Sequence, residues 1–372
     1  MEFLYSVADY YYFVYWFVVL LMTVKQFNTI NKYPRYMVVE RTFDYQPILI
    51  FSVFFIIFYG LRPMHYCFGD TVNYKKTYEL LQTFGVFDAD GTEERESDWL
   101  FYYIQRFCAE IMDIHLWFLL MMCCYIIPMY KGCKQIDKKH GAMLMLFCVG
   151  AFEFYTFAVN GVRNGIACSF AILAVAALTK KKMVVAAIFC FIATGFHKSV
   201  ALPAAAMFFA YYVRNPKYMF IAWLGAIGVS LAAGSQIDAM LSAMSYDERM
   251  ADNLQNDDAD GMELEHRFRW DFLLYSSMPI ILAAYTIFKR KLYDKTYLLI
   301  LGTYMYANSF WVLAIRAMFS NRIAYLSWFI YPIVLAYPLL NFEVFKKNHS
   351  KKTAWILLAH FGFTTILWLL GK

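Results

Sequence analysis

The sequence predicts an all-α polytopic membrane protein, and three observations lead to this class. Hydrophobic residues make up 61% of the 372-residue chain and charged residues only 17%, whereas soluble domains are nearer half apolar and a quarter charged. Mean hydropathy is +0.45. The apolar residues also occur in blocks of roughly 17–23 residues, which is long enough to cross a bilayer as a helix. We therefore expect a single integral membrane domain over residues 1–372.

Each apolar block predicts one helix, which gives about twelve crossings at the usual span length. In chain order the expected spans are 2–24, 46–61, 114–130, 142–160, 164–179, 183–196, 199–213, 218–235, 270–288, 296–314, 323–342 and 354–371. Residues 98–113 predict a further helix at the membrane interface.

The short loops set the orientation. Those expected on one side are 25–45, 131–141, 180–182, 214–217, 289–295 and 343–353, and they hold 21 of the 34 Lys and Arg residues. Because short basic loops stay in the cytoplasm, both termini are expected to face outward. Residues 62–98 and 236–268 then form two long outer loops. Loops of this length are often lids or binding elements, but their acidic centres are more simply solvated connections.

The stretch "TGFHKSVALP", residues 194–203, places polar residues inside an apolar run of 31 residues between two basic loops. That run is too long for one helix and shorter than the roughly 40 residues that two crossings need. We expect a pair of short helices, or one that re-enters, with His197 and Ser199 at the outer apex. Ser199 is expected to cap the helix 199–213.

Arginine is segregated to the outer side. Nine of the 13 Arg residues fall outside, but only four of the 21 Lys residues. The positive-inside rule does not distinguish the two residue types, whereas the planar Arg fork binds phosphate in a bidentate manner and keeps its charge when dehydrated. A polyanion site that opens outward would explain the segregation. The alternative is that these side chains pair with acidic loops or extend to lipid headgroups.

Motifs for metals, nucleotides and redox chemistry are missing from the sequence. It contains no P-loop, no G-x-G-x-x-G and no H-E-x-x-H, and none of the eight Cys residues forms a C-x-x-C pair. "DDAD" at 257–260 could suggest a metal–diphosphate site, but it lies in a polar loop with no apolar frame. We expect no metal site, no cofactor and no nucleic-acid partner.

Six segments occur in an order that matches a known family. They read "GLRPMHYCFGDTVNYKKTYELL" (60–81), "ESDWLFYYIQRF" (96–107), "NGVRNGIACSFAILAVAALTKKK" (160–182), "TGFHKSVALP" (194–203), "HRFRWDFLLYSSMPI" (266–280) and "SNRIAYLSWF" (320–329). Together they resemble the EpsG-like family of bacterial polysaccharide polymerases, which is related to the Wzy-type O-antigen polymerases. The first segment departs from the pattern, because "PMHYCFGDT" stands where a smoother run into Gly-Thr-Asp is expected.

The resemblance implies a glycosyltransferase of GT-C-type architecture in the bacterial cytoplasmic (inner) membrane, with an active site that faces outward. Its substrate would be a polyprenyl-diphosphate-linked oligosaccharide. The growing glycan would pass from one lipid diphosphate to a sugar hydroxyl of another lipid-linked repeat unit. Membrane lipid is an implied partner, and the resemblance also allows a chain-length regulator and other polysaccharide-assembly proteins.

Site residues follow from this reaction. Fixed cations would stabilise the departing diphosphate, and the candidates are Arg62, Arg163, Arg267, Arg269, Arg316 and Arg322. The acceptor hydroxyl needs a base, for which the candidates are His197, Glu153 and Asp271. A carboxylate within a span is costly unless it is paired, and the expected partner of Glu153 is Arg163 or His197. Asp271 could instead cap its helix or pair with an Arg. The substrate-binding candidates are Asp70, Tyr74 and Ser199, although Tyr74 would also suit an interfacial aromatic belt.

Other functions remain open at this point. A ligase that moves finished glycan from the same lipid diphosphate to a lipid core uses the same donor. An O-acyltransferase would need a cytoplasmic acyl donor, whereas His197 is expected outside. A flippase or exporter of lipid-linked glycans would predict pseudo-symmetric halves, which the sequence lacks. A channel or structural subunit would leave the outer Arg residues unexplained.

Overall fold

The computed structural model describes residues 7–35, 37–84, 98–243, 268–317 and 320–370. All regular structure in these ranges is helical, which confirms the all-α prediction. The chain divides into two compact units, one formed by residues 1–200 and 339–372 and the other by residues 201–338. Arg267 lies outside the described residues, as do residues 85–97 of the loop predicted over 62–98 and residues 244–267 of the loop predicted over 236–268.

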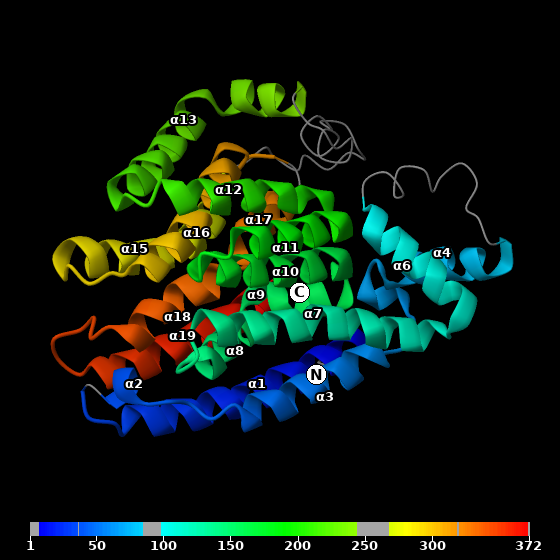
Figure 1. Ribbon diagram of the computed structural model, residues 1–372, viewed down its shortest axis with the longest axis horizontal. Coiled ribbons are helices and arrows are strands. Elements are labelled where there is room, and N and C mark those ends of the chain that lie inside the picture. Colours follow the sequence, from blue (N-terminus) through cyan, green and yellow to red (C-terminus); the bar gives the residue numbers. More distant parts are fainter. Residues whose placement is uncertain (1–6, 36, 85–97, 244–267, 318–319, 371–372) are drawn as a thin grey trace. The chain divides into compact units, whose positions relative to one another are not determined.

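The first unit contains most of the helices. They are α1 (Val7–Asn31), α2 (Met37–Glu40), α3 (Gln46–Gly60), η1 (Tyr66–Phe68), α4 (Thr71–Phe84), α6 (Trp99–Ile111), α7 (Ile114–Ile136), α8 (Gly141–Val149), α9 (Phe152–Val159), α10 (Val162–Thr179), α11 (Met183–Phe196), η2 (Lys198–Val200) and α19 (His349–Leu370). Helix α10 packs against both α7 and α11, α3 against α7, α1 against α19, and α4 against α6 (Figure 1).

The second unit is built around α16 (Lys295–Leu313). Its other helices are α12 (Ala201–Tyr212), α13 (Pro216–Ala243), α15 (Trp270–Ala284), η3 (Tyr285–Lys289) and α17 (Ser320–Trp328). Helix α18 (Tyr331–Asn341) begins in this unit, and its last residues belong to the first. The buried amide of Asn308 on α16 accepts a hydrogen bond from Trp223 Nε1 at 2.8 Å and donates to Ser327 Oγ at 3.0 Å. This polar contact ties α13 and α17 to α16.

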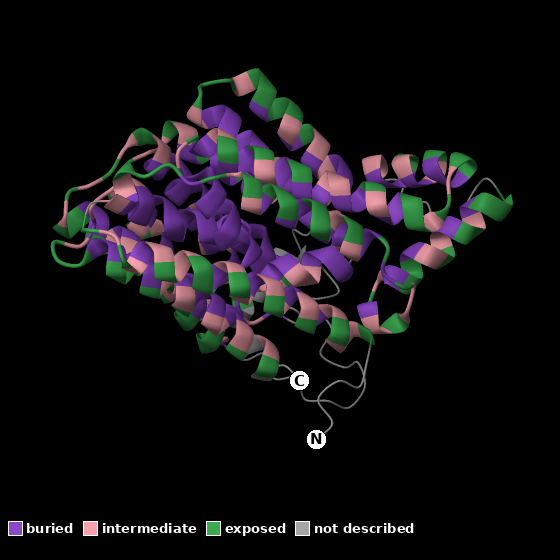
Figure 2. Cartoon of the chain, turned by 90° about the horizontal axis from the view of Figure 1, so that it is seen from below, coloured by how far each residue is buried: buried purple, intermediate pink, exposed green. Residues whose placement is uncertain are grey.

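Length and composition identify several helices as membrane spans. Within the described residues six helices are long and apolar enough to cross a bilayer, or up to seven if the bent pair α8–α9 is one span. Large apolar side chains such as Phe13, Phe17 and Leu21 point away from the protein along α1, and exposed residues follow the outward faces of the helices in Figure 2. Lipid would cover such faces at no hydrophobic cost, so the fold is that of a multi-pass membrane protein.

The predicted crossing 142–160 is not one straight helix. Helices α8 and α9 are bent by 71° at Gly150 and Ala151. A break in an apolar environment leaves backbone carbonyls that need new partners. Side chains supply them here: the Tyr15 hydroxyl donates to Val149 O at 2.7 Å, and the Thr364 hydroxyl donates to Gly150 O at 2.9 Å. Glu153 therefore lies in the first turn of α9, not in the interior of a continuous helix.

Candidate functional site

Asp98 is the centre of a polar cluster in the first unit. It immediately precedes α6, and its side chain is 4% exposed. Its Oδ2 lies 3.0 Å from Arg163 Nη1 and 3.5 Å from His197 Nδ1, and its Oδ1 accepts the Lys198 N–H at 3.0 Å. Because these bonds occupy the carboxylate, it does not cap its own helix. One acidic side chain thus joins the starts of α6 and α10 to the segment between α11 and η2.

The cluster fixes the charge on Asp98. Burial alone would raise the pKa of this carboxyl group, but the hydrogen bond from His197, the charge of Arg163 and the Lys198 N–H outweigh burial and lower the pKa below its ordinary value. Asp98 is therefore ionised at neutral pH. An ionised carboxylate only accepts hydrogen bonds, so the ring nitrogen that faces it, Nδ1 of His197, carries the hydrogen.

The geometry of His197 then has a chemical consequence. With the hydrogen on Nδ1, a neutral imidazole has its lone pair on Nε2. The His197 side chain is 26% exposed, and Nε2 lies on the ring edge away from the Nδ1 that faces Asp98. A carboxylate that orients a His and selects its tautomer is the arrangement that makes an imidazole an effective general base.

A close helix approach brings His197 to Asp98. A Cβ on Gly195 would lie 2.8 Å from Leu100 Cβ and 3.0 Å from the Trp99 ring. Only glycine lets the end of α11 approach the start of α6 this closely. Ser199, which was expected to cap the following helix, lies inside η2 and not at a helix start, because a 3₁₀ turn separates His197 from α12.

Arg163 lies in the first turn of α10, where its guanidinium is 5.6 Å from the centroids of both the Tyr74 and Phe101 rings. A cation at a helix N-terminus is unfavourable by itself, and Asp98 compensates for it. Tyr74 was predicted as a substrate-binding residue. Its ring is instead 5% exposed and packs against Phe101, so it supports Arg163 and does not offer a face to a ligand.

Arg62 holds neighbouring segments of the first unit together through hydrogen bonds. The residue is fully buried, Nη1 donates to Tyr59 O at 2.7 Å, and Nη2 donates to Thr71 Oγ1 at 3.0 Å. The Thr71 hydroxyl in turn donates to Val159 O at 2.9 Å. These contacts fasten the start of α4 to the end of α9. They favour a structural role for Arg62 over the direct diphosphate contact that the sequence suggested.

Asp70 lies in the turn between η1 and α4. Gly69 has a φ of +58°, and a side chain there would collide with the Asn160 amide. The Asp70 N–H donates to Asn160 Oδ1 at 2.9 Å. The motif Gly69-Asp70-Thr71 is therefore docked by its backbone and its hydroxyl onto the residues that precede α10. The structure brings it together with the V-R-N-G-I-A segment that begins at Val162.

Glu153 does not have the partners that the sequence suggested. Arg163 and His197, its expected partners, both contact Asp98 instead. Glu153 is 3% exposed, and neither carboxylate oxygen has a hydrogen-bond partner in the described part of the chain. The bend between α8 and α9 places it at a helix start, and this corrects the predicted pairing.

The second unit holds the remaining described candidates. Arg269 Nη2 lies 2.7 Å from Asp271 Oδ2, with both side chains partly exposed, so Asp271 is an Arg partner, one of the roles the sequence left open. The Arg316 guanidinium lies 5.6 Å from the centroid of the Phe268 ring. Arg322 is exposed in the first turn of α17.

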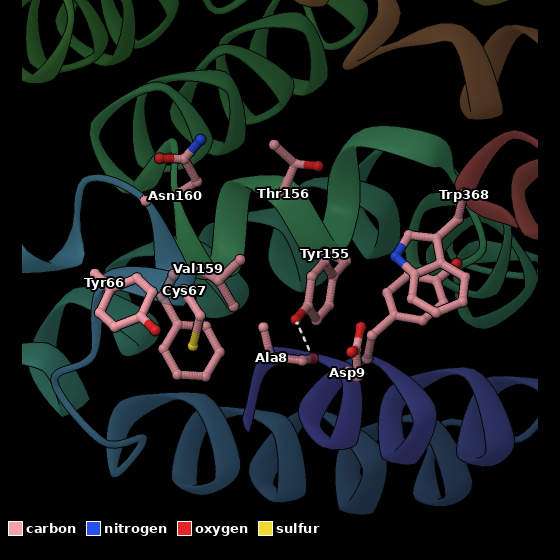
Figure 3. Close-up of a pocket in the computed structure, with 12 residues that line it drawn as sticks. Ala8, Asp9, Tyr66, Cys67, Tyr155, Thr156, Val159, Asn160 and Trp368 are labelled. Carbon is pink, nitrogen blue, oxygen red and sulfur yellow. Dashed lines mark hydrogen bonds between the residues drawn. The ribbon is translucent and has the colours of Figure 1, made fainter. Parts of the chain in front are cut away.

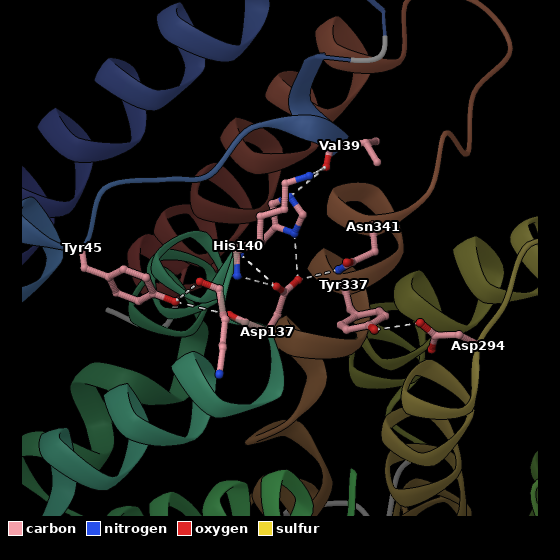
Figure 4. A network of polar contacts seen from close by, with 9 residues as sticks. Val39, Tyr45, Asp137, His140, Asp294, Tyr337 and Asn341 are labelled. Carbon is pink, nitrogen blue, oxygen red and sulfur yellow. Dashed lines mark hydrogen bonds and ion pairs between the residues drawn. The ribbon is translucent and has the colours of Figure 1, made fainter. Parts of the chain in front are cut away.

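A buried Asp–His pair in the first unit was missed by the sequence reasoning (Figure 4). Asp137 Oδ2 lies 2.8 Å from both His140 Nδ1 and Asn341 Nδ2, and His140 Nε2 faces Val39 O at 3.2 Å. Although burial raises the pKa of Asp137, the bonds from His140 and Asn341 lower it to about 2. Protein partners occupy both ring nitrogens, so this pair fastens three segments together and is not a reaction centre. The signal in the sequence was an Asp and a His three residues apart between two apolar blocks.

Within the described ranges, no group of three or more His, Cys, Asp or Glu side chains is placed to hold a metal ion.

Comparison with known proteins gives one family. The model described as "EpsG family" matches residues 45–371, nearly the whole chain. No curated protein and no solved structure matches the sequence.

Proposed function

The chain belongs to the EpsG family, and from that premise we propose that it polymerises lipid-linked oligosaccharide repeat units. Membership of the family indicates a function of the polysaccharide-polymerase type. In the proposed reaction the growing glycan moves from polyprenyl diphosphate to a sugar hydroxyl of another lipid-linked repeat. The reaction takes place at the outer face of the cytoplasmic membrane, within a GT-C-type architecture of about twelve crossings.

The observation that carries the proposal is the Asp98 cluster, in which one carboxylate contacts a His that can act as a base and an Arg that can bind phosphate. His197 Nδ1 faces Asp98 at 3.5 Å, and Arg163 Nη1 faces the same oxygen at 3.0 Å. A glycosyl transfer from a diphosphate needs both functions: a base for the acceptor hydroxyl and positive charge for the leaving group.

The steps balance with these residues. The acceptor oxygen forms a bond to the anomeric carbon of the donor sugar, and its proton passes to Nε2 of His197. The bond between that carbon and the diphosphate oxygen breaks, and the diphosphate leaves with the electron pair. Asp98 stabilises the imidazolium that forms. Release of the proton to water restores the base.

Arginine side chains supply the charge for the leaving group. The diphosphate gains negative charge as the bond breaks, so fixed cations stabilise the transition state more than the ground state. Arg163 is the candidate in the first unit, and Arg269, Arg316 and Arg322 are separate candidates in the second unit, with Arg267 next to Arg269 in sequence. The proposed reaction needs no metal or cofactor, because the donor is already activated by its diphosphate.

The test uses cells that lack this protein. They are complemented with the wild type or with Arg163→Ala, His197→Ala or Arg269→Ala, each checked for normal insertion in the membrane. We expect the null cell to accumulate single lipid-linked repeats, and the three variants not to restore long chains. Long polymer that persists in the null cell but stays on the lipid carrier would indicate a ligase instead. Repeats trapped on the cytoplasmic side would indicate a flippase.

A further inference from the structure

A pocket of about 480 Å³ lies in the first unit, beside the Gly69-Asp70-Thr71 turn (Figure 3). Its walls come from the start of α1, η1, the end of α9 and the end of α19. Tyr66 and Asn160 lie toward one end of the pocket, Asp9 and Trp368 toward the other, with Tyr155 between them. The volume is within the usual range for small-molecule sites, roughly 300–1,000 Å³.

The lining has a definite chemical character. It combines aromatic rings with short polar side chains, and among the described residues that form it there is a carboxylate, Asp9, but no Lys or Arg. A phosphate would find no Lys or Arg side chain among the described lining residues to balance its charge. A hydrocarbon chain would offer no hydrogen bond to the Thr156 hydroxyl or to the Asn160 amide N–H₂. The pocket thus disfavours both the diphosphate and the lipid part of a lipid-linked glycan.

Tyr66 gives the pocket an aromatic platform. The residue is 77% exposed, and the centroid of its ring lies 4.1 Å from that of the neighbouring His65 ring. An exposed aromatic ring with a negative face attracts the weakly positive C–H groups on the apolar face of a sugar ring. Asn160 accepts the Asp70 N–H through Oδ1, so its amide N–H₂ is the part of the side chain that can donate to a ligand. Thr156 can both donate and accept.

We propose that this pocket is a glycan-binding subsite that takes a neutral sugar ring of the lipid-linked oligosaccharide. The inference rests on the proposed function, and it assigns the sugar and the diphosphate to different places. The diphosphate lies at Arg163 in the first unit, and an uncharged ring lies against Tyr66 with its hydroxyls on Asn160 and Thr156. Asn160 connects the two places, because it holds the turn before α4 and is three residues before Arg163.

The experiment measures binding by the purified full-length protein in detergent micelles. The probe is the neutral oligosaccharide fraction released by mild acid from the host cell's own polysaccharide, and inorganic pyrophosphate is the competitor. Tyr66→Ala should weaken the dissociation constant about tenfold, since the stacking face is lost. Thr156→Val should weaken it severalfold through loss of the hydroxyl. The matched control is Tyr212→Ala, because Tyr212 is 74% exposed but does not line the pocket.

The outcomes separate this inference from the proposed function. Sugar binding that Tyr66→Ala and Thr156→Val leave unchanged overturns the subsite, as does displacement of the sugar by pyrophosphate or the absence of sugar binding by the wild type. Arg163→Ala and His197→Ala should abolish polymerisation yet keep sugar binding, which supports both proposals. If a null cell still polymerises, the proposed function fails, while the binding measurement still decides the subsite.

Discussion

Replacement of Asp98 by Asn tests the centre of the candidate site most directly. The amide has the shape of the carboxylate, so its oxygen can still accept the Lys198 N–H that Oδ1 now accepts at 3.0 Å. The other half of the side chain changes from acceptor to donor. It would then point an N–H₂ group at Arg163 Nη1 and at His197 Nδ1, both of which need an acceptor there.

The expected magnitude has two parts. Arg163 and Asp98 have side chains that are 14% and 4% exposed, and removal of one partner from a buried ion pair costs about 3–5 kcal/mol. We expect the lower end, about 3 kcal/mol of stability, because the bond to Lys198 remains. The amide also favours the His197 tautomer with hydrogen on Nε2. Loss of a general base lowers rates by about 10²–10⁴-fold, so polymerisation should fall at least about 100-fold.

The assay is chain extension by the purified protein on a lipid-linked repeat, read as a ladder of products, together with thermal unfolding in detergent. Asp113→Asn is the matched control, because Asp113 also precedes a helix but is exposed and caps it through His115 N at 2.7 Å, and Asn caps equally well. Asp98→Glu keeps the charge and should recover part of the activity. Wild-type extension by a well-inserted Asp98→Asn protein would refute both the base and its orientation.

The contribution of Asp98 to stability should change with pH in one definite direction. Because the folded protein lowers the pKa of Asp98, its contribution to stability is fully present above the ordinary carboxyl pKa and is lost as the pH falls through the lowered value. The wild type should therefore lose stability on the acid side through this group, and Asp98→Asn should lack that part of the transition. An identical acid transition in both proteins would contradict the assignment.

Three further predictions address other parts of the first unit. Glu153→Gln should keep polymerisation within about twofold, because neither carboxylate oxygen has a partner among the described residues; a hundredfold loss in the same ladder assay would return Glu153 to the role of base. Asp137→Asn should lower the free energy of unfolding by about 2 kcal/mol, since the pKa of Asp137 is lowered from 3.8 to about 2. This contribution is present above pH about 4 and is lost as the pH falls toward 2, so thermal unfolding at pH 7 and pH 3 should differ less in the variant than in the wild type. Arg62→Lys should destabilise the protein by about 2–3 kcal/mol, because a lysine cannot reach Tyr59 O and Thr71 Oγ1 with the same fork; a fully stable variant that loses activity would instead support direct diphosphate contact.

The helical class of the fold, and much of its element order, could be predicted from the sequence. Blocks of apolar residues predict helices because span length and hydropathy are local properties of the chain. The short helices on either side of His197 followed from an apolar run too short for two full crossings, and the structure has α11 and α12 there. The family could likewise be recognised from six short segments in order, and the match over residues 45–371 confirms it.

The candidate site could be predicted only in part. His197 was singled out because charge in an apolar run is costly, and Arg163 because arginine is segregated to the outer side. The cost of a buried carboxylate also suggested that Glu153 would pair with one of them. Asp98 was present in the quoted segment "ESDWLFYYIQRF" and was not selected, because its partners Arg163 and His197 are far away in the sequence. The bend between α8 and α9 could not be predicted from the periodicity of the sequence either. The hydrogen bonds that it needs come from Tyr15 and Thr364, which lie far away along the chain.

The sequence by itself therefore determined that this protein lies in a membrane, which segments form helices, and which residue types are available for chemistry. Only the tertiary structure decided which carboxylate meets which cation. Asp98 and His197 are separated by 99 residues, and their contact depends on the approach of α11 to α6 at Gly195. Hydropathy and periodicity describe how each segment meets its surroundings, whereas an ion pair is set by the packing of separate segments, which no local pattern contains.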